Sequence, residues 1–243
     1  RFLHIHNNQI DEVDAFLFED DGSYHRYQAG ENTEITSRLI PVANPTFPLS
    51  LSPHQQKTHY LRFYAEGALA ARLQIETWPK IVADAEQQNA MSGFLWGIFF
   101  LVFVYCTYFY IRFRETLYGW LSLSALGFQF AITWYMTGDG GYWLLSAAHR
   151  PWISNRISLF GLSIAGGGIL AFLLELLEIP RFFPLLDRFM RAIRLFYFVW
   201  AIAVFLLPYL VSARLMPWVI GLNFVPTLAA VVLAFRGDRV ARL

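Results

Sequence analysis

The sequence has a single cysteine, Cys106, and little charge for its length. One cysteine excludes a disulfide framework and a metal site built from several thiolates, and its place in an apolar run predicts a small buried or lipid-facing residue. Charged residues make up 15% of the chain, whereas soluble domains average about 25%. The apolar part also lacks a nucleophile–base–acid set, a phosphate-binding loop and paired catalytic carboxylates. We therefore expect neither a soluble enzyme nor catalysis in this chain, and no cofactor.

Charge is unevenly divided along the chain, with a break near residue 90. Residues 1–90 contain 7 basic and 12 acidic residues, a net charge of −5, whereas residues 91–243 contain 12 and 6, a net charge of +6. The formal net charge of +1 is thus the sum of opposite halves, which argues against a nucleic-acid-binding protein. The chain opens on Arg1 and shows no signal peptide, so we expect a fragment of a longer protein.

The second part contains five apolar stretches of the length that a membrane-spanning helix needs, about 20 residues. It is therefore expected to form an all-α, multi-span transmembrane bundle over residues 91–243. The arginine-rich stretch 179–191, between the third and fourth spans, mixes bulky apolar residues with bases. This mixture is typical of an interfacial helix, with a docking surface for a cytoplasmic partner as the alternative. The predicted spans lie near residues 91–111, 116–137, 155–177, 193–213 and 215–235.

Several residues inside the predicted spans indicate how the helices pack and bend. Gly161 and Ala165 have the small-xxx-small spacing that permits close approach of helices. Gln129 and Asn223 are expected to make interhelical hydrogen bonds. Pro208, inside the fourth predicted span, frees a carbonyl group and predicts a kink.

The positions of the arginines predict the orientation of the chain in the membrane. If the amino terminus lies outside, nine arginines fall in inner loops and three fall in outer loops or at a helix entrance. Cytoplasmic loops are enriched in basic residues, so we expect a multi-pass membrane protein with its amino terminus outside and its carboxyl terminus in the cytoplasm. The inner nine are Arg112, Arg114, Arg181, Arg188, Arg191, Arg194, Arg236, Arg239 and Arg242, and the other three are Arg150, Arg156 and Arg214.

Before residue 90 the hydrophobic period is two, which indicates β-strands. Val13, Ala15 and Leu17 occupy alternate positions, and similar alternation occurs within 47–51, 60–65 and 69–78. Short strands with no helical stretch between them predict an antiparallel β-sandwich over residues 1–79. From Lys80 the pattern becomes helical, and residues 80–90 are expected to form a juxtamembrane connector. This connector continues into the first span as one helix from about 81 to 112.

The best candidate for ligand binding is a polar face of the predicted sandwich. Arg62 and Tyr64 lie on one strand, and Arg72, Gln74 and Glu76 lie on the strand expected beside it. Sugars bind such surfaces because their C–H faces stack on rings while their hydroxyls bond to planar polar groups. The alternative is an ordinary solvated face.

His4 and His6 share one face of a strand and could both reach a metal ion. Zinc sites in proteins have at least three protein ligands, and no cysteine or suitably spaced acid completes the set. We therefore expect no metal site.

Five short motifs resemble the bacterial seven-transmembrane receptors with diverse intracellular signalling modules. They are DEVD at 11–14, YLRFY at 60–64, Trp78-Pro79, GFLWG at 93–97 and RETLY at 114–118. The resemblance implies a partial jelly-roll sensor domain of carbohydrate-binding type (residues 1–79) and a membrane bundle. It also implies a cytoplasmic effector, such as a diguanylate cyclase or a histidine kinase, that this chain does not contain. A bacterial receptor of this kind is expected in the inner membrane, with its amino terminus in the periplasm. Members of the family have seven spans, whereas five are predicted here.

These observations together predict a membrane signalling receptor that senses an extracytoplasmic ligand, with carbohydrate as the expected class, and that transmits the signal through its helices. The expected partners are membrane lipid, an extracytoplasmic small molecule or glycan, a cytoplasmic signalling effector in cis or in trans, and a second copy of the chain in a homodimer. The alternative is a small-molecule transporter with an accessory outer domain. Transporters usually have broken-helix sites near the membrane midplane and internal repeats, and neither is evident in this sequence.

Overall fold

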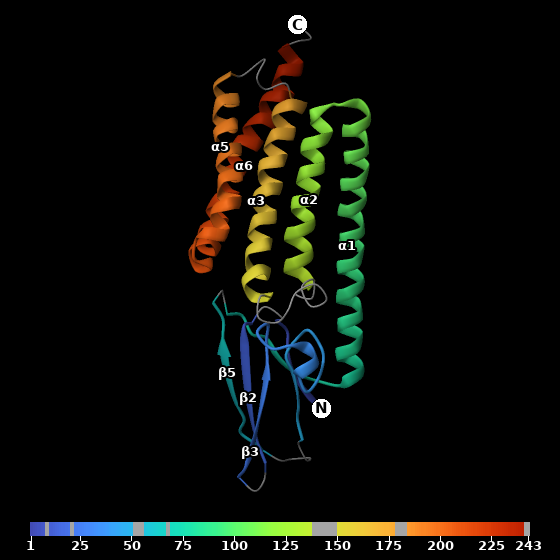
Figure 1. Cartoon of the computed structure of the whole chain (residues 1–243), viewed down its shortest axis with the longest axis vertical. Helices are drawn as coiled ribbons and strands as arrows, with labels where there is room; N and C mark the ends of the chain where they lie inside the picture. Colours follow the sequence, from blue (N-terminus) through green and yellow to red (C-terminus); the bar gives the residue numbers. More distant parts are fainter. Residues whose placement is uncertain are drawn as a thin grey trace. The chain divides into compact units, whose positions relative to one another are not determined.

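The computed structural model describes residues 1–7, 10–19, 22–50, 56–66, 69–137, 150–177 and 184–240. The chain divides into two compact units. The first comprises Arg1–Gly93 with Trp134–Asn155, and the second comprises Phe94–Thr133 with Arg156–Leu243. All strands belong to the first unit, which we call the outer module, and the second unit is a helical bundle (Figure 1).

The outer module contains two antiparallel sheets of three strands each. One sheet has the order β4-β1-β6 and the other has the order β3-β2-β5. The predicted sandwich fold, followed by a helical bundle, is therefore confirmed. The strands are β1 (Phe2–Ile5), β2 (Glu12–Phe18), β3 (Tyr24–Ala29), β4 (Thr46–Pro48), β5 (Tyr60–Tyr64) and β6 (Leu73–Glu76).

A single apolar core joins the two sheets. Val13, Ala15 and Leu17 on β2 pack in one cluster with Ile5 of β1 and Phe47 of β4. These side chains are at most 7% exposed, so the alternation seen in β2 correctly identified its inner face.

Gly30 directly follows β3 and has a φ of 118°, a backbone conformation that residues with a side chain rarely adopt. A Cβ atom at this position would lie 2.6 Å from the carbonyl oxygen of Asp11. The close approach lets Glu31 N–H donate to the Ile10 carbonyl group at 2.9 Å. Glycine is therefore required at this turn.

The alternation in β6 identified its two faces but not which residues are buried. Leu73 and Ile75 pair with Ile5 and Leu3 of the core face but are 47% and 57% exposed, whereas Glu76, on the opposite face, is 5% exposed. Among the described strands, β6 lies at the edge of its sheet beside β1, so its core-facing side is only partly covered. The face that carries Glu76 also carries Phe2, whose ring contacts Trp78 at a centroid distance of 5.7 Å, so the chain that follows β6 covers this face.

The helix α1 (Trp78–Phe113) contains 36 residues and runs without a break through the range 81–112 expected to be one helix. Pro79 lies in its first turn, where a missing N–H group costs no intrahelical hydrogen bond. The helix ends at Phe113, and the next residue, Arg114, has a φ of 60° and donates its N–H to the Tyr110 carbonyl group at 2.9 Å. This left-handed residue is a C-cap, and α2 (Thr116–Thr137) begins two residues later.

The remaining helices of the described residues are the short 3-10 helix Ile35–Ser37, α3 (Arg150–Leu176), α5 (Pro184–Leu206) and α6 (Tyr209–Val240). The predicted bounds 193–213 for the fourth helix are wrong, because Pro208 separates α5 from α6 instead of kinking one helix. The Pro208 carbonyl group accepts hydrogen bonds from Val211 N–H and Ser212 N–H, which start α6. The separate interfacial helix expected at 179–191 is also wrong where the structure describes it, since residues 184–191 form the first turns of α5.

Three helices in the described part of the chain are long and apolar enough to cross a membrane: Trp78–Phe113, Arg156–Leu176 and Pro184–Leu206. Buried residues of α3, α5 and α6 form the main apolar cluster of the bundle. Within it, Tyr197 donates a hydrogen bond to the Val219 carbonyl group at 2.6 Å and so links α5 to α6. Cys106 is 4% exposed and is thus buried, one of the two environments that its sequence context predicted.

Helices α2 and α3 make backbone contact through small residues. A Cβ atom at Gly127 would lie 2.5 Å from Ala165 N, and one at Gly161 would lie 2.6 Å from Ala131 N. The prediction that Gly161 and Ala165 mark a close helix contact is confirmed. The expected hydrogen bonds of Gln129 are not found, since neither polar atom of its buried side chain has a partner among the described residues. Asn223 makes one long bond, from Nδ2 to the Gly166 carbonyl group at 3.4 Å.

Candidate functional site

The five residues predicted to bind ligand do not form one surface. Arg62 and Tyr64 lie on β5, which pairs with β2, whereas Gln74 and Glu76 lie on β6, which pairs with β1. Arg72 precedes β6. The expectation that the two strands are neighbours is therefore wrong: β5 and β6 follow each other in sequence but belong to different sheets. Each group is part of a separate polar cluster.

The first cluster covers the outward face of the sheet β3-β2-β5. In the register of this sheet, Asp14 lies between Gln28 and Arg62, and Phe16 lies between Arg26 and Tyr60. Cross-strand partners point to the same face, so strands far apart in sequence supply one surface. We call this surface the aromatic platform; it consists of Asp14, Phe16, Phe18, Tyr24, Arg26, Gln28, Tyr60, Arg62 and Tyr64.

Asp14 is the charged centre of the aromatic platform. Its Oδ1 accepts hydrogen bonds from Arg26 Nη2 at 2.9 Å and from Gln28 Nε2 at 3.0 Å, and Arg62 Nη1 lies 3.4 Å from its Oδ2. The Asp14 side chain is 4% exposed, whereas those of Arg26 and Arg62 are 49% and 62% exposed. Burial on its own would raise the pKa of Asp14, but the bonds from Gln28 and Arg26 outweigh it and lower this pKa. The carboxylate thus holds two exposed guanidinium groups in place.

Exposed rings surround this charged centre. Tyr24, Tyr60 and Tyr64 are 55%, 62% and 47% exposed. The Phe18 ring lies between two of them, with its centroid 5.5 Å from that of Tyr24 and 5.8 Å from that of Tyr60. Rings that rest on one another lose little rotamer freedom when a ligand binds, so the surface is rigid and partly apolar.

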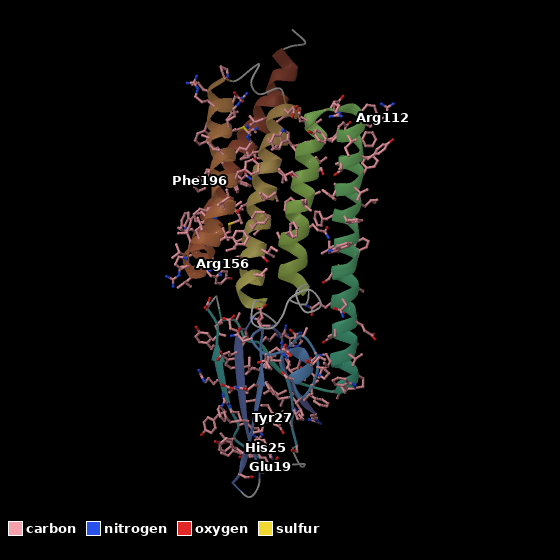
Figure 2. All side chains as sticks on the ribbon, in the orientation of Figure 1. Glu19, His25, Tyr27, Arg112, Arg156 and Phe196 are labelled. Carbon is pink, nitrogen blue, oxygen red and sulfur yellow. The ribbon has the colours of Figure 1, made fainter. Side chains whose placement is uncertain are left out.

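Sequence reasoning identified two members of the platform, Arg62 and Tyr64, and missed the others. The available signal was Asp14, a carboxylate in the middle of an otherwise apolar strand. The opposite face of β3 carries His25 and Tyr27, which are labelled in Figure 2. In the register of the sheet they pair with Leu17 and Ala15. His25 is exposed, but it lies on the face of β3 opposite the platform and does not belong to it.

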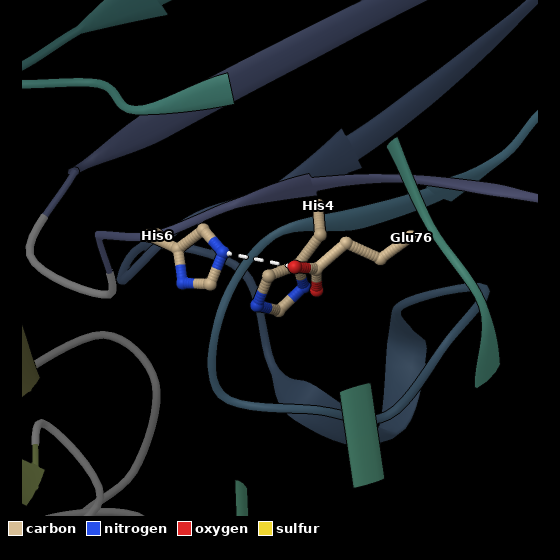
Figure 3. A group of neighbouring side chains, drawn as sticks. All are labelled: His4, His6 and Glu76. Atoms are coloured by element: carbon tan, nitrogen blue, oxygen red, sulfur yellow. Dashed lines mark ion pairs between the residues drawn. The ribbon is translucent and has the colours of Figure 1, made fainter. Parts of the chain in front are cut away.

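The second cluster, which we call the His–Glu cluster, consists of His4, His6 and Glu76 (Figure 3). One potential ligand atom from each of the three residues lies within 4.8 Å of the other two. His6 Nε2 is 3.6 Å from Glu76 Oε1, and the two imidazole rings meet edge to face at 4.5 Å. Glu76 is thus the third potential ligand. The sequence analysis placed it on the polar face of its strand and did not connect it with the two histidines.

The hydrogen bonds around the two histidines define which ring nitrogen carries the proton. Thr46 donates its hydroxyl proton to the Asn44 carbonyl group at 3.0 Å, so its oxygen accepts from His4 Nδ1 at 2.8 Å. In the amide orientation that satisfies both of its ends, Gln74 donates to His6 Nε2 at 2.7 Å and accepts from Arg72 Nη2 at 2.9 Å. Both histidines then carry the proton on Nδ1 and have a lone pair on Nε2.

Glu76 is the buried anion of the His–Glu cluster, with its side chain 2% exposed. Lys80 Nζ, in the first turn of α1, donates to Glu76 Oε1 at 2.5 Å. This bond is the main reason that the pKa of Glu76 is lowered, whereas burial lowers the pKa of His4. The second carboxylate oxygen, Oε2, has no hydrogen-bond partner among the described residues.

Comparison with protein families gives two matches that together cover most of the chain. Residues 1–77 match the 7TMR-DISM extracellular 2 family, and residues 88–243 match the family described as 7TM diverse intracellular signalling. The boundary between the two matches lies within α1. No curated protein and no solved structure matches the chain significantly.

Proposed function

Because the chain belongs to the 7TM diverse intracellular signalling family, we propose that it is the sensing and transmembrane part of a receptor for an extracytoplasmic carbohydrate. The chain is a membrane protein with an extracellular sensor domain and a signalling bundle. In this proposal it transmits a signal to a cytoplasmic effector and has no catalytic role. Family membership favours this function over the alternative of a small-molecule transporter.

The aromatic platform is the observation that supports a carbohydrate ligand. Exposed tyrosine rings provide flat apolar surfaces for the C–H faces of sugar rings. The guanidinium groups of Arg26 and Arg62, held by Asp14, can donate paired hydrogen bonds to hydroxyl or carboxylate oxygens. The platform is a flat sheet face, which buries less of a ligand than a deep pocket does. We therefore expect micromolar to millimolar affinity.

The sites proposed from the sequence are reassigned accordingly. Arg62 and Tyr64 remain in the proposed carbohydrate site, where Tyr24, Tyr60 and Arg26 join them. Arg72, Gln74 and Glu76 are excluded from it, because they lie on the other sheet.

We infer that α1 carries the signal toward the membrane. It follows β6 after one residue and continues without interruption to Phe113, and a continuous helix transmits rotation and tilt better than a flexible tether. For the orientation, the arginine distribution supports an outer module in the periplasm and a carboxyl terminus in the cytoplasm.

The proposal is tested by binding of glycans to the full chain in lipid nanodiscs. An array of cell-wall fragments and exopolysaccharide oligosaccharides identifies a binder, whose affinity is then measured by calorimetry. Tyr64→Ala and Tyr60→Ala should each weaken binding about 10-fold, equivalent to about 1.4 kcal/mol. His25→Ala is the matched control, because His25 is exposed on the same sheet but on the opposite face.

Far-UV circular dichroism and thermal unfolding should be the same for the wild type and the three variants, because all three side chains are exposed. A silent array would refute the carbohydrate ligand and leave a protein partner as the better hypothesis. Binding that is unchanged in both tyrosine variants would place the ligand elsewhere on the molecule.

A further inference from the structure

The His–Glu cluster has the composition and geometry of an incomplete zinc site. Two imidazoles and one glutamate form a ligand set that zinc uses in proteins, with bonds of about 2.0–2.2 Å. Such bonds hold tetrahedral ligand atoms about 3.4 Å apart, and the three potential ligand atoms here lie within 4.8 Å of one another.

The tautomers of both histidines suit a metal ion. Thr46 holds the Nδ1 proton of His4, and Gln74 donates to Nε2 of His6, so each ring has its lone pair on Nε2. At His6 a metal ion would replace the hydrogen bond from Gln74. Metal-ligating histidines commonly donate the other ring N–H to an oxygen atom, which fixes the orientation of the ring. The hydroxyl of Thr46 does this for His4, which is 3% exposed.

Glu76 supplies the second, independent observation. Its Oε2 is buried and has no hydrogen-bond partner in the described part of the chain. A buried carboxylate oxygen without a partner is costly, and a cation held between Oε2 and the two Nε2 atoms would satisfy it. Lys80 already binds the other oxygen, Oε1.

We propose that His4, His6 and Glu76 bind one Zn²⁺ ion at the junction between β6 and α1. Imidazole nitrogens favour zinc over calcium and magnesium, which prefer oxygen ligands. Three protein ligands leave a fourth tetrahedral position for a water molecule or another oxygen ligand. The site lies on the sheet opposite the aromatic platform and takes a different class of ligand, so the proposal is independent of the proposed carbohydrate site.

Zinc and Lys80 compete for the same carboxylate. The Lys80 ammonium group lies 2.5 Å from Glu76 Oε1, and a divalent cation at Oε2 both repels it and withdraws charge from the carboxylate. Binding of zinc therefore weakens the ion pair that joins the end of β6 to the first turn of α1. The ion thus acts at the point where the outer module connects to its helix.

The test is titration of Zn²⁺ into the full chain in nanodiscs, purified through a tag that contains no histidine. We expect one ion per chain and, with Co²⁺ as the probe, the visible absorption of a tetrahedral site. His6→Asn and Glu76→Gln should each weaken zinc binding at least 10-fold, since even groups that only orient ligands contribute about 10–100-fold. Lys80→Met should strengthen zinc binding, because it removes the competing cation.

The matched control is His25→Asn, an exposed histidine on the other sheet, which should leave zinc affinity unchanged. His6 is only partly buried, so His6→Asn should fold, and circular dichroism without metal verifies this. Equal zinc affinity of the wild type and His6→Asn would overturn the site. Weaker or unchanged binding in Lys80→Met would overturn the competition between the ion and Lys80.

Discussion

The contact between α2 and α3 gives a stringent test of the bundle, because two glycines bring the helices to backbone contact. Gly127→Ala places a methyl group 2.5 Å from Ala165 N and 2.7 Å from the Gly161 carbonyl oxygen. Gly161→Ala places one 2.6 Å from both Ala131 N and the Gly127 carbonyl oxygen. These obstacles are backbone atoms, so no side chain can rotate away and the two helices must separate.

The magnitude follows from two opposing effects. Overpacking costs about 1–3 kcal/mol, while alanine regains up to about 1 kcal/mol of helix propensity over glycine. Because the obstacles are backbone atoms, we expect a net destabilisation of about 2 kcal/mol, or about 5 °C in unfolding temperature for a chain of this size. The double variant should cost less than the sum of the single variants, since one separation of the helices accommodates both methyl groups.

Cys106 provides the assay. It is the single cysteine of the chain and is 4% exposed, so a thiol-reactive fluorophore reports thermal unfolding in detergent. Gly97→Ala and Gly221→Ala are matched controls within helices, because no atom of the described residues lies within 4 Å of a Cβ at either position. They should unfold at or slightly above the wild-type temperature. If Gly127→Ala is as stable as Gly97→Ala, the crossing of α2 and α3 described above is incorrect.

Two further predictions concern the platform and the orientation. The bonds from Gln28 and Arg26 and the nearby Arg62 lower the pKa of Asp14. The contribution of Asp14 to stability is therefore present above its unfolded pKa of about 3.9, and it is lost as the pH falls through the pKa of the folded state. Asp14→Asn should therefore destabilise the full chain by about 1–3 kcal/mol at pH 7 and by less at pH 3, as chemical unfolding at both values will show; an equal difference at both would contradict the assignment. In a Cys106→Ser background, Ser23→Cys should label with an impermeant thiol reagent in spheroplasts and Glu115→Cys should not, and the reverse pattern would overturn the orientation inferred from the arginines.

Sequence patterns predicted the elements whose surroundings are uniform along their length. β2 is the central strand of its sheet, so one face meets the core along the whole strand and the alternation of Val13, Ala15 and Leu17 is reliable. The helix α1 begins within three residues of its expected start, because the change from period two to a helical pattern follows Pro79. The spacing of Gly161 and Ala165 correctly indicated a close helix contact.

The errors occur where a residue's environment depends on tertiary packing. At the edge strand β6 the same alternation assigned Glu76 to solvent, because the pattern cannot register that α1 covers that face. The spacing on α3 indicated that a helix could approach, but not that its partner would be Gly127 on α2. Pro208 was consistent with either a kink or a break, and only the start of α6 at its carbonyl group distinguishes them. The candidate site was divided for a related reason, since consecutive strands need not be neighbours in a sandwich.

The arrangement of the strands implies that the two proposed sites act on α1 in different ways. The platform belongs to the sheet β3-β2-β5, whereas α1 follows β6 of the other sheet, so the apolar core between the sheets separates a ligand on the platform from β6. Zinc in the His–Glu cluster would act one step from the helix, through Glu76 and Lys80. Either ligand shifts the equilibrium of the receptor only by its difference in affinity for the two states. Closely packed cores resist small displacements. We therefore expect a ligand in the His–Glu cluster to change the start of α1 more directly than an equally tight ligand on the platform.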